Sequence, residues 1–354
     1  MDRQKKATNL VKNSKNYKKH SKTSKIITLF VIILIISVPC LFFNILNPLI
    51  VKFLEKNFAV VTSRDDLLVH FVNVGQGDSI AINLPDGKLA VIDAGPINST
   101  NVLISYLNDR VLNYKHDKKI DYLILTHADA DHIGGATKVI STFDIVNIYM
   151  PTIPADTATY LNLCRAVEEK NCNVFNYSNP LDVGVNYSLK SFETLDYTDT
   201  NNSCPLIKLK FMSKTFLFTG DLEAKAEKRY VELYGDELDV DVLKVAHHGS
   251  KYSSCEEFLQ QVTPQYSVIS SGNKYGHPNE ETLERLVDAN SQIVRTDTVG
   301  NVMFVVGKNY NLDLLTGYYT VSGFIFDYRI IILIIDGVLI VNIIAIAIRK
   351  EKKH

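Results

Sequence analysis

The stretch LILTHADADHIGGA, residues 123–136, places an apolar run directly before a dense group of polar side chains. Alternate residues of an extended loop project to one side, and the small Ala128 and Ala130 occupy the positions between. We expect a helix to start at His132, with Gly134–Gly135 allowing close backbone packing behind it. One such loop can serve two metal ions a few ångströms apart, as two-metal hydrolases require. Its four potential ligands are His127, Asp129, Asp131 and His132.

Two further groups of ligand-type residues also follow strand-like runs. FLFTGD, residues 216–221, ends in Asp221, and VLKVAHH, residues 242–248, ends in two histidines. A single histidine in such a place is more often structural, but three strand ends that share one pattern favour a common metal site. Which of His247 and His248 is the ligand stays open at this point.

The chain between 67 and 318 predicts one α/β domain. PDG at 85–87 and MSK at 212–214 each join two strand-like runs as a hairpin turn, and helical patterns follow both hairpins. Antiparallel hairpins followed by helices favour two packed sheets with helices outside. The expected strands are 67–74, 79–84, 88–93, 120–126, 145–149, 205–211, 215–221, 240–246, 266–270, 292–296 and 301–306, and the expected helices are 99–114, one from 132, 157–171, 222–234, 254–262 and 279–290.

Charge is distributed unevenly along the 354 residues. Residues 1–25 carry nine Lys or Arg against a single acid, and 349–354 carry four against another. The stretch between the tails therefore has a formal net charge of about −12. Such an acidic stretch argues against tight, non-specific binding to long nucleic acid, which depends on many contacts between basic side chains and phosphates.

Each basic tail adjoins an apolar run, and these runs predict two membrane spans. A signal peptide and a buried core helix are the respective alternatives for the first and the second run. Because both Lys/Arg clusters lie on the outer flanks, the positive-inside rule places both termini in the cytoplasm and the domain outside the cell. The expected division is a basic tail at 1–25, a transmembrane helix at 26–51, a linker at 52–66, the α/β domain at 67–318, a transmembrane helix at 324–348 and a basic tail at 349–354.

Two sets of motifs carry a family resemblance. Those that resemble the metallo-β-lactamase superfamily are VIDAG (91–95), THADADHIGGA (126–136), TGD (219–221) and HHGS (247–250). Those that more closely resemble the exterior hydrolase domain of the ComEC family of competence proteins also include VNVGQGDS (72–79), NNSCPLIKL (201–209) and NKYGHP (273–278). The resemblance covers about 67–306 and implies an αββα sandwich with a dinuclear metal site at the sheet edges. It does not extend to the many-helix channel of that family, because this chain offers two spans.

The resemblance also implies a set of ligands. It puts His127 and the residue at 129 on a first metal ion, and Asp221 between the two ions. The second ion receives Asp131, His132 and a terminal histidine, either His247 or His248. Asp93, at a strand end beneath the site, is expected to support a ligand.

The sequence departs from the superfamily pattern at two places. Asp129 stands where the superfamily normally has a histidine, and no histidine occurs between Ile133 and Ala246. Asn202, Ser203 or water would then take the position of the missing histidine. Such an oxygen-rich first site weakens the preference for zinc and tolerates manganese. We therefore expect two divalent ions, Zn or Mn.

Two bridged divalent ions generate hydroxide near neutral pH and hold the oxygens of an in-line displacement, which suits phosphodiesters. Asp131 is a candidate proton acceptor. His277 is a candidate for contacting phosphate or protonating the leaving group, with a plain loop residue as the alternative. Lys251 and Lys274 adjoin the metal motifs and would attract an anionic substrate.

The first functional interpretation is a membrane-anchored phosphodiesterase or nuclease acting on DNA outside the cytoplasm. The second is a phosphodiesterase acting on cell-envelope polymers, such as a phosphocholine or teichoic-acid esterase. An alternative of another class is a catalytically inert membrane partner in a DNA-uptake or envelope complex. The complete set of strand-end ligands argues against the inert partner, and the missing histidines argue against β-lactam hydrolysis. The sequence leaves the channel or envelope partner, the oligomeric state and the cysteine pairing open.

Overall fold

The chain divides into two compact units, of which Thr62–Gly317 holds both large sheets. In the unit of Met1–Val61 and Tyr318–His354, the short strands β16 (Thr320–Val321) and β17 (Phe324–Ile325) pair antiparallel. The computed structural model describes residues 65–112, 118–170, 172–177, 181–184, 186–272, 274–316 and these two strands.

The first sheet of the larger unit has eight strands, and its middle strands change from antiparallel to parallel pairing. β1, β2 and β3 pair antiparallel, whereas β3, β4, β5 and β6 pair parallel. In spatial order the strands are β15 (Leu312–Thr316), β14 (Val302–Val306), β1 (Leu67–Phe71), β2 (Ile80–Asn83), β3 (Leu89–Ile92), β4 (Lys119–Ile124), β5 (Asp144–Tyr149) and β6 (Asn173–Phe175).

The second sheet repeats this plan with seven strands. β7 to β10 pair antiparallel, and β10 to β13 pair parallel. In spatial order its strands are β13 (Gln292–Arg295), β12 (Tyr266–Ile269), β11 (Val242–Lys244), β10 (Lys214–Phe218), β9 (Ile207–Phe211), β8 (Tyr187–Ser191) and β7 (Asp182–Val183).

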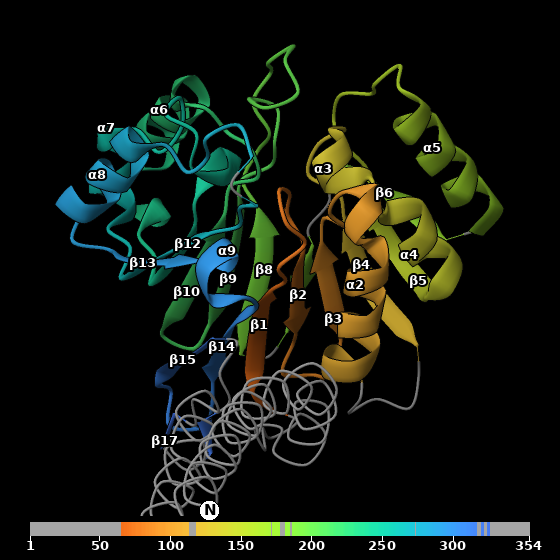
Figure 1. The fold of residues 1–354 in the computed structure, drawn as a ribbon, viewed down its shortest axis with the longest axis horizontal. Coiled ribbons are helices and arrows are strands. Elements are labelled where there is room, and N and C mark those ends of the chain that lie inside the picture. The colour runs from red at the N-terminus through yellow and green to blue at the C-terminus, as the bar shows by residue number, and fades with distance from the viewer. Residues whose placement is uncertain are drawn as a thin grey trace, which may run out of the picture. The chain divides into compact units, whose positions relative to one another are not determined.

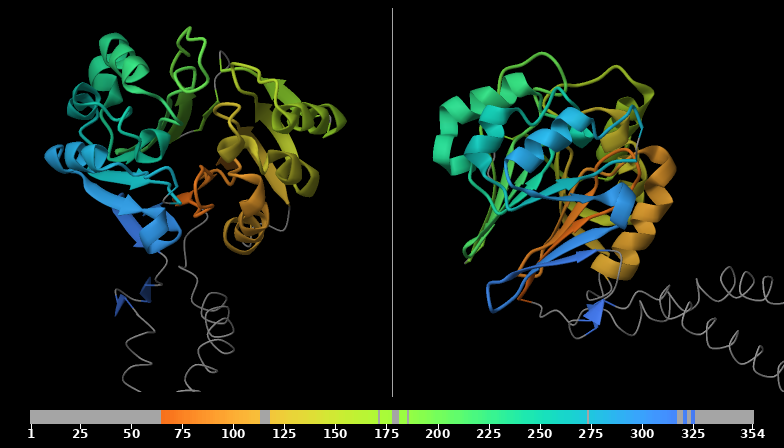
Figure 2. Two further views of the ribbon diagram at one scale, coloured as in Figure 1. Left: turned by 45° about the horizontal axis from the view of Figure 1, so that its top comes forward. Right: turned by 60° about the vertical axis from the view of Figure 1, so that its left-hand side comes forward.

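Three apolar clusters define the layers. One lies between the sheets and contains residues of both, such as Phe71 and Phe216. A second joins the outer face of the first sheet to α2 (Thr100–Tyr106), α4 (Ala136–Thr142) and α5 (Ala158–Lys170). The third joins the second sheet to α6 (Ala224–Tyr234), α7 (Glu256–Val262) and α8 (Glu280–Asp288). The helices therefore cover the outer faces of the two sheets, as Figure 1 and the turned views of Figure 2 show.

Most predicted elements are confirmed, and the differences are local. The hairpins over 85–87 and 212–214 form as expected. The helix expected over 99–114 is α2 followed by a π-helical turn, Leu107–Val111. The helix expected from His132 begins two residues earlier, as α3 (Ala130–Ile133), directly after Asp129, whose backbone is extended.

Both predicted closing strands are present, as β13 and β14. They lie in different sheets, because the short helix α9 (Thr296–Val299) turns the chain from one sheet to the other. β14 pairs with β1 and with β15, a strand that the sequence did not predict.

The predicted membrane spans fall almost entirely outside the described residues. Segment 26–51 lies wholly outside them, and only Phe324–Ile325 of segment 324–348 is described, as β17. Among the helices that the structure describes, none combines the length and the apolar character needed to cross a bilayer.

A buried histidine makes the domain sensitive to acid. His70 of β1 is 2% exposed, and its Nδ1 lies 3.0 Å from the Tyr106 hydroxyl. Burial lowers the pKa of His70 from 6.5 to about 4. The unfolded chain therefore binds a proton at this residue below pH 6.5, whereas the folded chain does so only near pH 4. The stability that the neutral imidazole provides is present above pH 6.5 and is lost as the pH falls toward 4.

We expect this group to account for a fall of up to about 3 kcal/mol in the free energy of unfolding between pH 7 and 4. Urea unfolding of Thr62–Gly317 at pH 7 and pH 4.5 measures it. The variant His70→Phe should lose clearly less stability over this interval than the wild type. Equal losses in the two proteins would show that His70 does not carry the effect.

Candidate metal centre

The ligand-type residues gather where strands of both sheets end. Parallel strands present their carboxyl ends at one edge of a sheet, and open α/β sheets bind ligands there. The first sheet contributes the loops that follow β1, β3 and β4, and the second contributes those that follow β10, β11 and β12. The residues concerned are Asp78, Asp93, His127, Asp129, Asp131, His132, Asp221, His247, His248 and Ser270.

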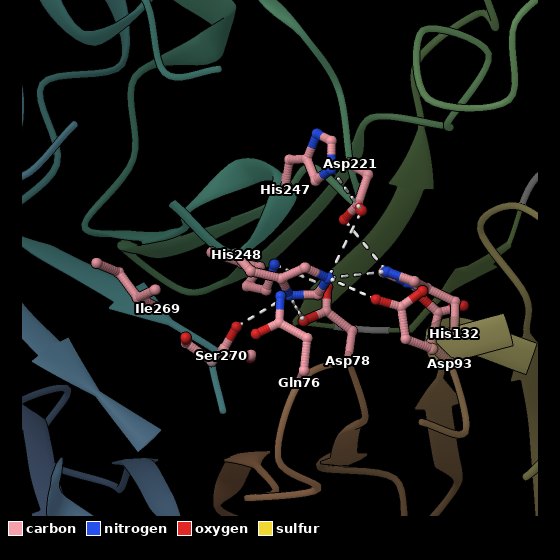
Figure 3. Close-up of polar contacts among 12 residues, drawn as sticks. Gln76, Asp78, Asp93, His132, Asp221, His247, His248, Ile269 and Ser270 are labelled. Carbon is pink, nitrogen blue, oxygen red and sulfur yellow. Dashed lines mark hydrogen bonds and ion pairs between the residues drawn. The ribbon is translucent and has the colours of Figure 1, made fainter. Parts of the chain in front are cut away.

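Asp221 lies at the middle of this group. Its Oδ1 is 3.2 Å from Nε2 of His132. Its Oδ2 is 3.5 Å from Nε2 of His248 and 3.7 Å from that of His247. The Nε2 atom of His127 lies 3.9 Å from the same oxygen. One buried carboxylate thus faces four imidazoles that come from two sheets, and Figure 3 shows three of them around it.

Asp93 fixes the orientation of the first loop. Its Oδ1 accepts the backbone N–H of Thr126 at 2.8 Å, and its Oδ2 accepts the Thr126 hydroxyl at 2.7 Å. The same Oδ2 lies 2.8 Å from Nδ1 of His132. Because a carboxylate only accepts hydrogen bonds, Nδ1 of His132 carries a proton, and Nε2 faces Asp221. The structure thus places Asp93 where a supporting residue was expected.

His248 and His127 are oriented in the same way. Nδ1 of His248 donates to the Ser270 carbonyl at 2.9 Å, and Nδ1 of His127 donates to the Thr126 hydroxyl oxygen at 3.1 Å. Both residues therefore turn Nε2 toward the centre. Nε2 of His248 lies 3.3 Å from Nε2 of His132 and 3.3 Å from Oδ2 of Asp131.

His247 differs from His248 in its surroundings. Its side chain is 23% exposed, and its Nδ1 lies 3.7 Å from Glu223 without a hydrogen-bond partner among the described residues. Figure 3 shows His247 on the other side of Asp221 from the facing rings of His132 and His248. The geometry therefore favours His248 over His247 as the terminal ligand. Both residues have left-handed backbone angles, with φ of 50° and 54°, a strained conformation that is typical of functional sites.

Asp129 and Asp131 form the open side of the centre, with side chains 45% and 32% exposed. Asp129 lies 3.7 Å from Nε2 of His127. Burial opposes ionisation of Asp131, but the hydrogen bond to His248 and the charge of His132 lower its pKa to about 2. Both carboxylates are therefore ionised at neutral pH.

The donor set fits divalent cations. The Nε2 atoms of His132 and His248 lie 3.3 Å apart, and Nε2 of His127 and Oδ1 of Asp221 are buried without a hydrogen-bond partner in the described part of the chain. Burial works against a proton on His132, but the charges of Asp221 and Asp93 raise its pKa well above 6.5, and the same field favours any cation. Among the described residues, four groups have all their ligand atoms within 4.8 Å of one another, and two of these are His127, His132 and Asp221, and Asp131, His132 and His248.

The residues expected to bind substrate are placed differently. His277 is half-buried, its ring 5.6 Å from that of His247, so it borders the centre. Lys251 and Lys274 are exposed on the loops that follow β11 and β12. Asn202 and Ser203 are buried in a turn, where they bond to Asp199 and Thr200, respectively.

Cys204, the residue that follows Ser203, connects this turn to the centre. The Sγ atom of Cys204 accepts the backbone N–H of Asp221 at 3.4 Å and thereby holds the main chain of the central carboxylate. The prediction that Asn202 or Ser203 takes the place of the missing histidine ligand stays a prediction.

A buried ion pair beside the centre was not predicted from the sequence. Nζ of Lys244 lies 2.7 Å from Oδ2 of Asp78, and both side chains are at most 2% exposed. The signal was a lysine inside the otherwise apolar run VLKVA and an aspartate in VGQGDS. Because Asp78 and Lys244 are 166 positions apart in the sequence, neither residue alone indicates that the other is its partner.

Known proteins match the same part of the chain. The model of the metallo-beta-lactamase superfamily matches residues 72–272. The chain is 30% identical to "ComE operon protein 3" of Bacillus subtilis (strain 168), over 67% of this chain and 32% of that protein. It is also 30% identical to "Competence protein ComA" of Neisseria gonorrhoeae, over 72% and 33%. A solved metallo-beta-lactamase fold protein, YhfI from Bacillus subtilis, aligns with a TM-score of 0.44 and 13% identity, over 71% of this chain and 100% of that chain.

The family model and the two competence proteins confirm the resemblance drawn from the motifs. The chain spans about a third of the length of the competence proteins that it matches. The family model covers more than half of the chain and includes every residue named for the centre except His277, which borders it. The chain therefore belongs to the metallo-beta-lactamase superfamily, whose members are metal-dependent hydrolases that usually bind two divalent ions.

Proposed function

We propose that this chain is a membrane-anchored two-metal phosphodiesterase that cleaves DNA outside the cytoplasm. The observation that carries the proposal is the position of Asp221, whose two oxygens face four imidazoles from both sheets. A carboxylate in such a position suits a bridge between two ions. Segments 26–51 and 324–348 are the proposed anchors, and the basic tails would place both termini in the cytoplasm.

Each ligand then has a distinct place. His127, Asp129 and Asp221 would hold the first ion, and Asp131, His132, His248 and Asp221 the second. Bound ions of this kind polarise phosphate oxygens and activate water. Because Asp129 and water would complete the ligands of the first ion, we expect this position to accept Mn as well as Zn.

Asp131 and His277, at the open side of the centre, would accept the proton and bind the phosphate of the substrate. Asp131 lies at the mouth and is ionised, so it is suited to accept a proton from the attacking water. Burial and the neighbouring histidines lower the pKa of His277 below 6.5, so this imidazole is neutral at pH 7. We therefore assign His277 to phosphate binding through a ring N–H rather than to protonation of the leaving group.

Two exposed tyrosines support a nucleic-acid substrate. Tyr252 and Tyr275 are 63% and 72% exposed, and each follows a lysine whose Nζ lies over the ring, at 5.3 and 4.7 Å from the centroid. The ring of Tyr275 is 6.4 Å from that of His277, at the border of the centre. Exposed aromatic rings beside basic groups bind single-stranded nucleic acid by stacking on its bases.

A matrix of metals and substrates tests the proposal. The unit Thr62–Gly317 and the full chain are loaded with Zn or Mn and given single-stranded DNA, double-stranded DNA or bis(4-nitrophenyl) phosphate. Cleavage of DNA supports the nuclease. Cleavage of the small ester alone favours an envelope phosphodiesterase, and metal binding without any hydrolysis contradicts the proposed activity.

We expect Tyr275→Ala to weaken binding of a short single-stranded oligonucleotide about tenfold, because stacking on an aromatic ring contributes about 1–3 kcal/mol per base. Hydrolysis of bis(4-nitrophenyl) phosphate, which has no base to stack, should change less than twofold. Fluorescence anisotropy and a colorimetric assay measure the two effects. Tyr310→Ala is the matched control, since this tyrosine is 48% exposed, has a similar φ of 59°, and lies in the turn between β14 and β15. Equal effects of the two changes would exclude stacking at Tyr275.

A further inference from the structure

Lys244 is fully buried in β11 beside the metal centre. Its Nζ lies 2.7 Å from Oδ2 of Asp78 and donates to the Val245 carbonyl at 2.8 Å. Removing two charges from water costs several kcal/mol each, and apolar pairs of similar volume are often as stable. Fold stability alone therefore does not explain why a buried ion pair occupies this place.

Asp78 turns its other oxygen toward the centre. Oδ1 lies 3.6 Å from Nδ1 of His248 and is buried without a hydrogen-bond partner among the described residues. Ligand atoms of Asp78, Asp221 and His248 all lie within 4.8 Å of one another. Figure 3 shows Asp78 beside His248, on the loop that also carries Gln76. The carboxylate thus lies behind one of the proposed ligands.

The same relation exists at His132, with one difference. Asp93 lies 2.8 Å from Nδ1 of His132 and backs that ring with a full negative charge. Behind His248, the charge of Asp78 is compensated by Lys244, and the Nδ1 hydrogen bond goes to the Ser270 carbonyl. A carboxylate behind a ligating histidine increases the donor strength of the ring, so the two histidines are backed unequally.

We propose that Asp78 and Lys244 form a tuning pair for the metal position at His248. Asp78 strengthens binding of the cation through His248, and Lys244 limits that strengthening by compensating the charge of Asp78. Both are positioning residues, because they act on the cation through another side chain. The inference concerns metal affinity and does not depend on which substrate the protein cleaves.

Titration of the metal-free full chain with Mn²⁺, with free ion measured by electron paramagnetic resonance, tests the pair. Asp78→Asn should raise the Kd of the ion held through His248 by about 10- to 100-fold, since it leaves the charge of Lys244 uncompensated. Lys244→Met should lower the Kd by about tenfold. The double variant Asp78→Asn/Lys244→Met restores a neutral pair and should lie within about threefold of the wild type.

The opposite signs separate tuning from a purely structural role. A structural role predicts that both single changes weaken binding and that the double variant is no better than Asp78→Asn, and this result would overturn the inference. If Lys244→Met does not fold, the Kd values of Asp78→Asn and the double variant decide the question. A Kd of the double variant that returns toward the wild-type value supports tuning. The matched control is Lys214→Met, which breaks a Lys214–Asp241 pair of the same 2.7 Å length in β10 and should leave the Kd unchanged.

Discussion

Replacing Asp221 with asparagine is expected to lower phosphodiester hydrolysis by about 10³-fold or more. The reason is the central position of this carboxylate. Both of its oxygens face imidazole Nε2 atoms, at 3.2 Å from His132 and at 3.5 Å from His248. An amide keeps one oxygen and replaces the other with an N–H donor, which repels a cation. The change therefore weakens both proposed metal positions at once, whereas loss of any other ligand affects one.

Initial rates with Zn- or Mn-loaded protein measure the effect. The control is Asp288→Asn, the same chemical change at an exposed position at the end of α8, which should retain wild-type activity. Circular dichroism establishes that both variants are folded. An Asp221→Asn variant with more than about a tenth of the wild-type rate would contradict the central position of Asp221 in the chemistry.

Gly77→Ala is expected to reduce both stability and activity. A Cβ at Gly77 would lie 2.3 Å from the carbonyl oxygen of Asp131 and 2.8 Å from Cδ of Pro96, and the backbone there has a φ of 140°. The first contact is with the backbone of Asp131, a proposed ligand, so relief of the clash displaces this residue. We expect a loss of about 3 kcal/mol or more in the free energy of unfolding and of at least about tenfold in hydrolysis.

Gly87→Ala is the control that separates the effect of a steric clash from the effect of backbone strain at positive φ. Gly87 has a φ of 85° in the turn between β2 and β3, and a Cβ there would meet nothing within 4 Å. Its replacement should cost only about 1–2 kcal/mol and leave hydrolysis unchanged. Urea unfolding and the colorimetric assay compare the two variants. Equal losses of stability and activity would show that the loop at Gly77 does not position Asp131.

The fold was predictable where local pattern and turn chemistry agree. The hairpins at 85–87 and 212–214, and the strands that precede Asp93, His127 and Asp221, follow from alternation and from residues that favour turns. The strands that were missed are the short β6 and β7, with β8 and β15. β6 and β7 are too short to show a pattern, with three and two residues, and β15 has no fully buried residue. These strands lie at or near sheet edges, where neighbouring strands rather than intrinsic pattern decide the pairing. β8 does alternate, with Tyr187 and Leu189 buried, so its pattern was present in the sequence.

The centre was predictable as a set of residues but not as a geometry. The loop at 127–132 and the strand ends at Asp221 and at 247–248 identified the ligand types. The choice between His247 and His248 depends on the Ser270 carbonyl, which lies 22 residues from His248 along the chain. Lys244 and Asp78 meet only because the two sheets bring them together. Such long-range pairings leave no periodic signal in the sequence.

The metal content of the purified protein decides whether Asp221 holds a two-metal centre. The full chain is stripped with a chelator, dialysed against Mn²⁺ or Zn²⁺ and analysed for bound metal, beside Asp221→Asn. We expect two ions per chain for the wild type and fewer than one for the variant. Fewer than one ion in the wild type, or two ions retained by Asp221→Asn, would contradict a two-metal centre held by this carboxylate.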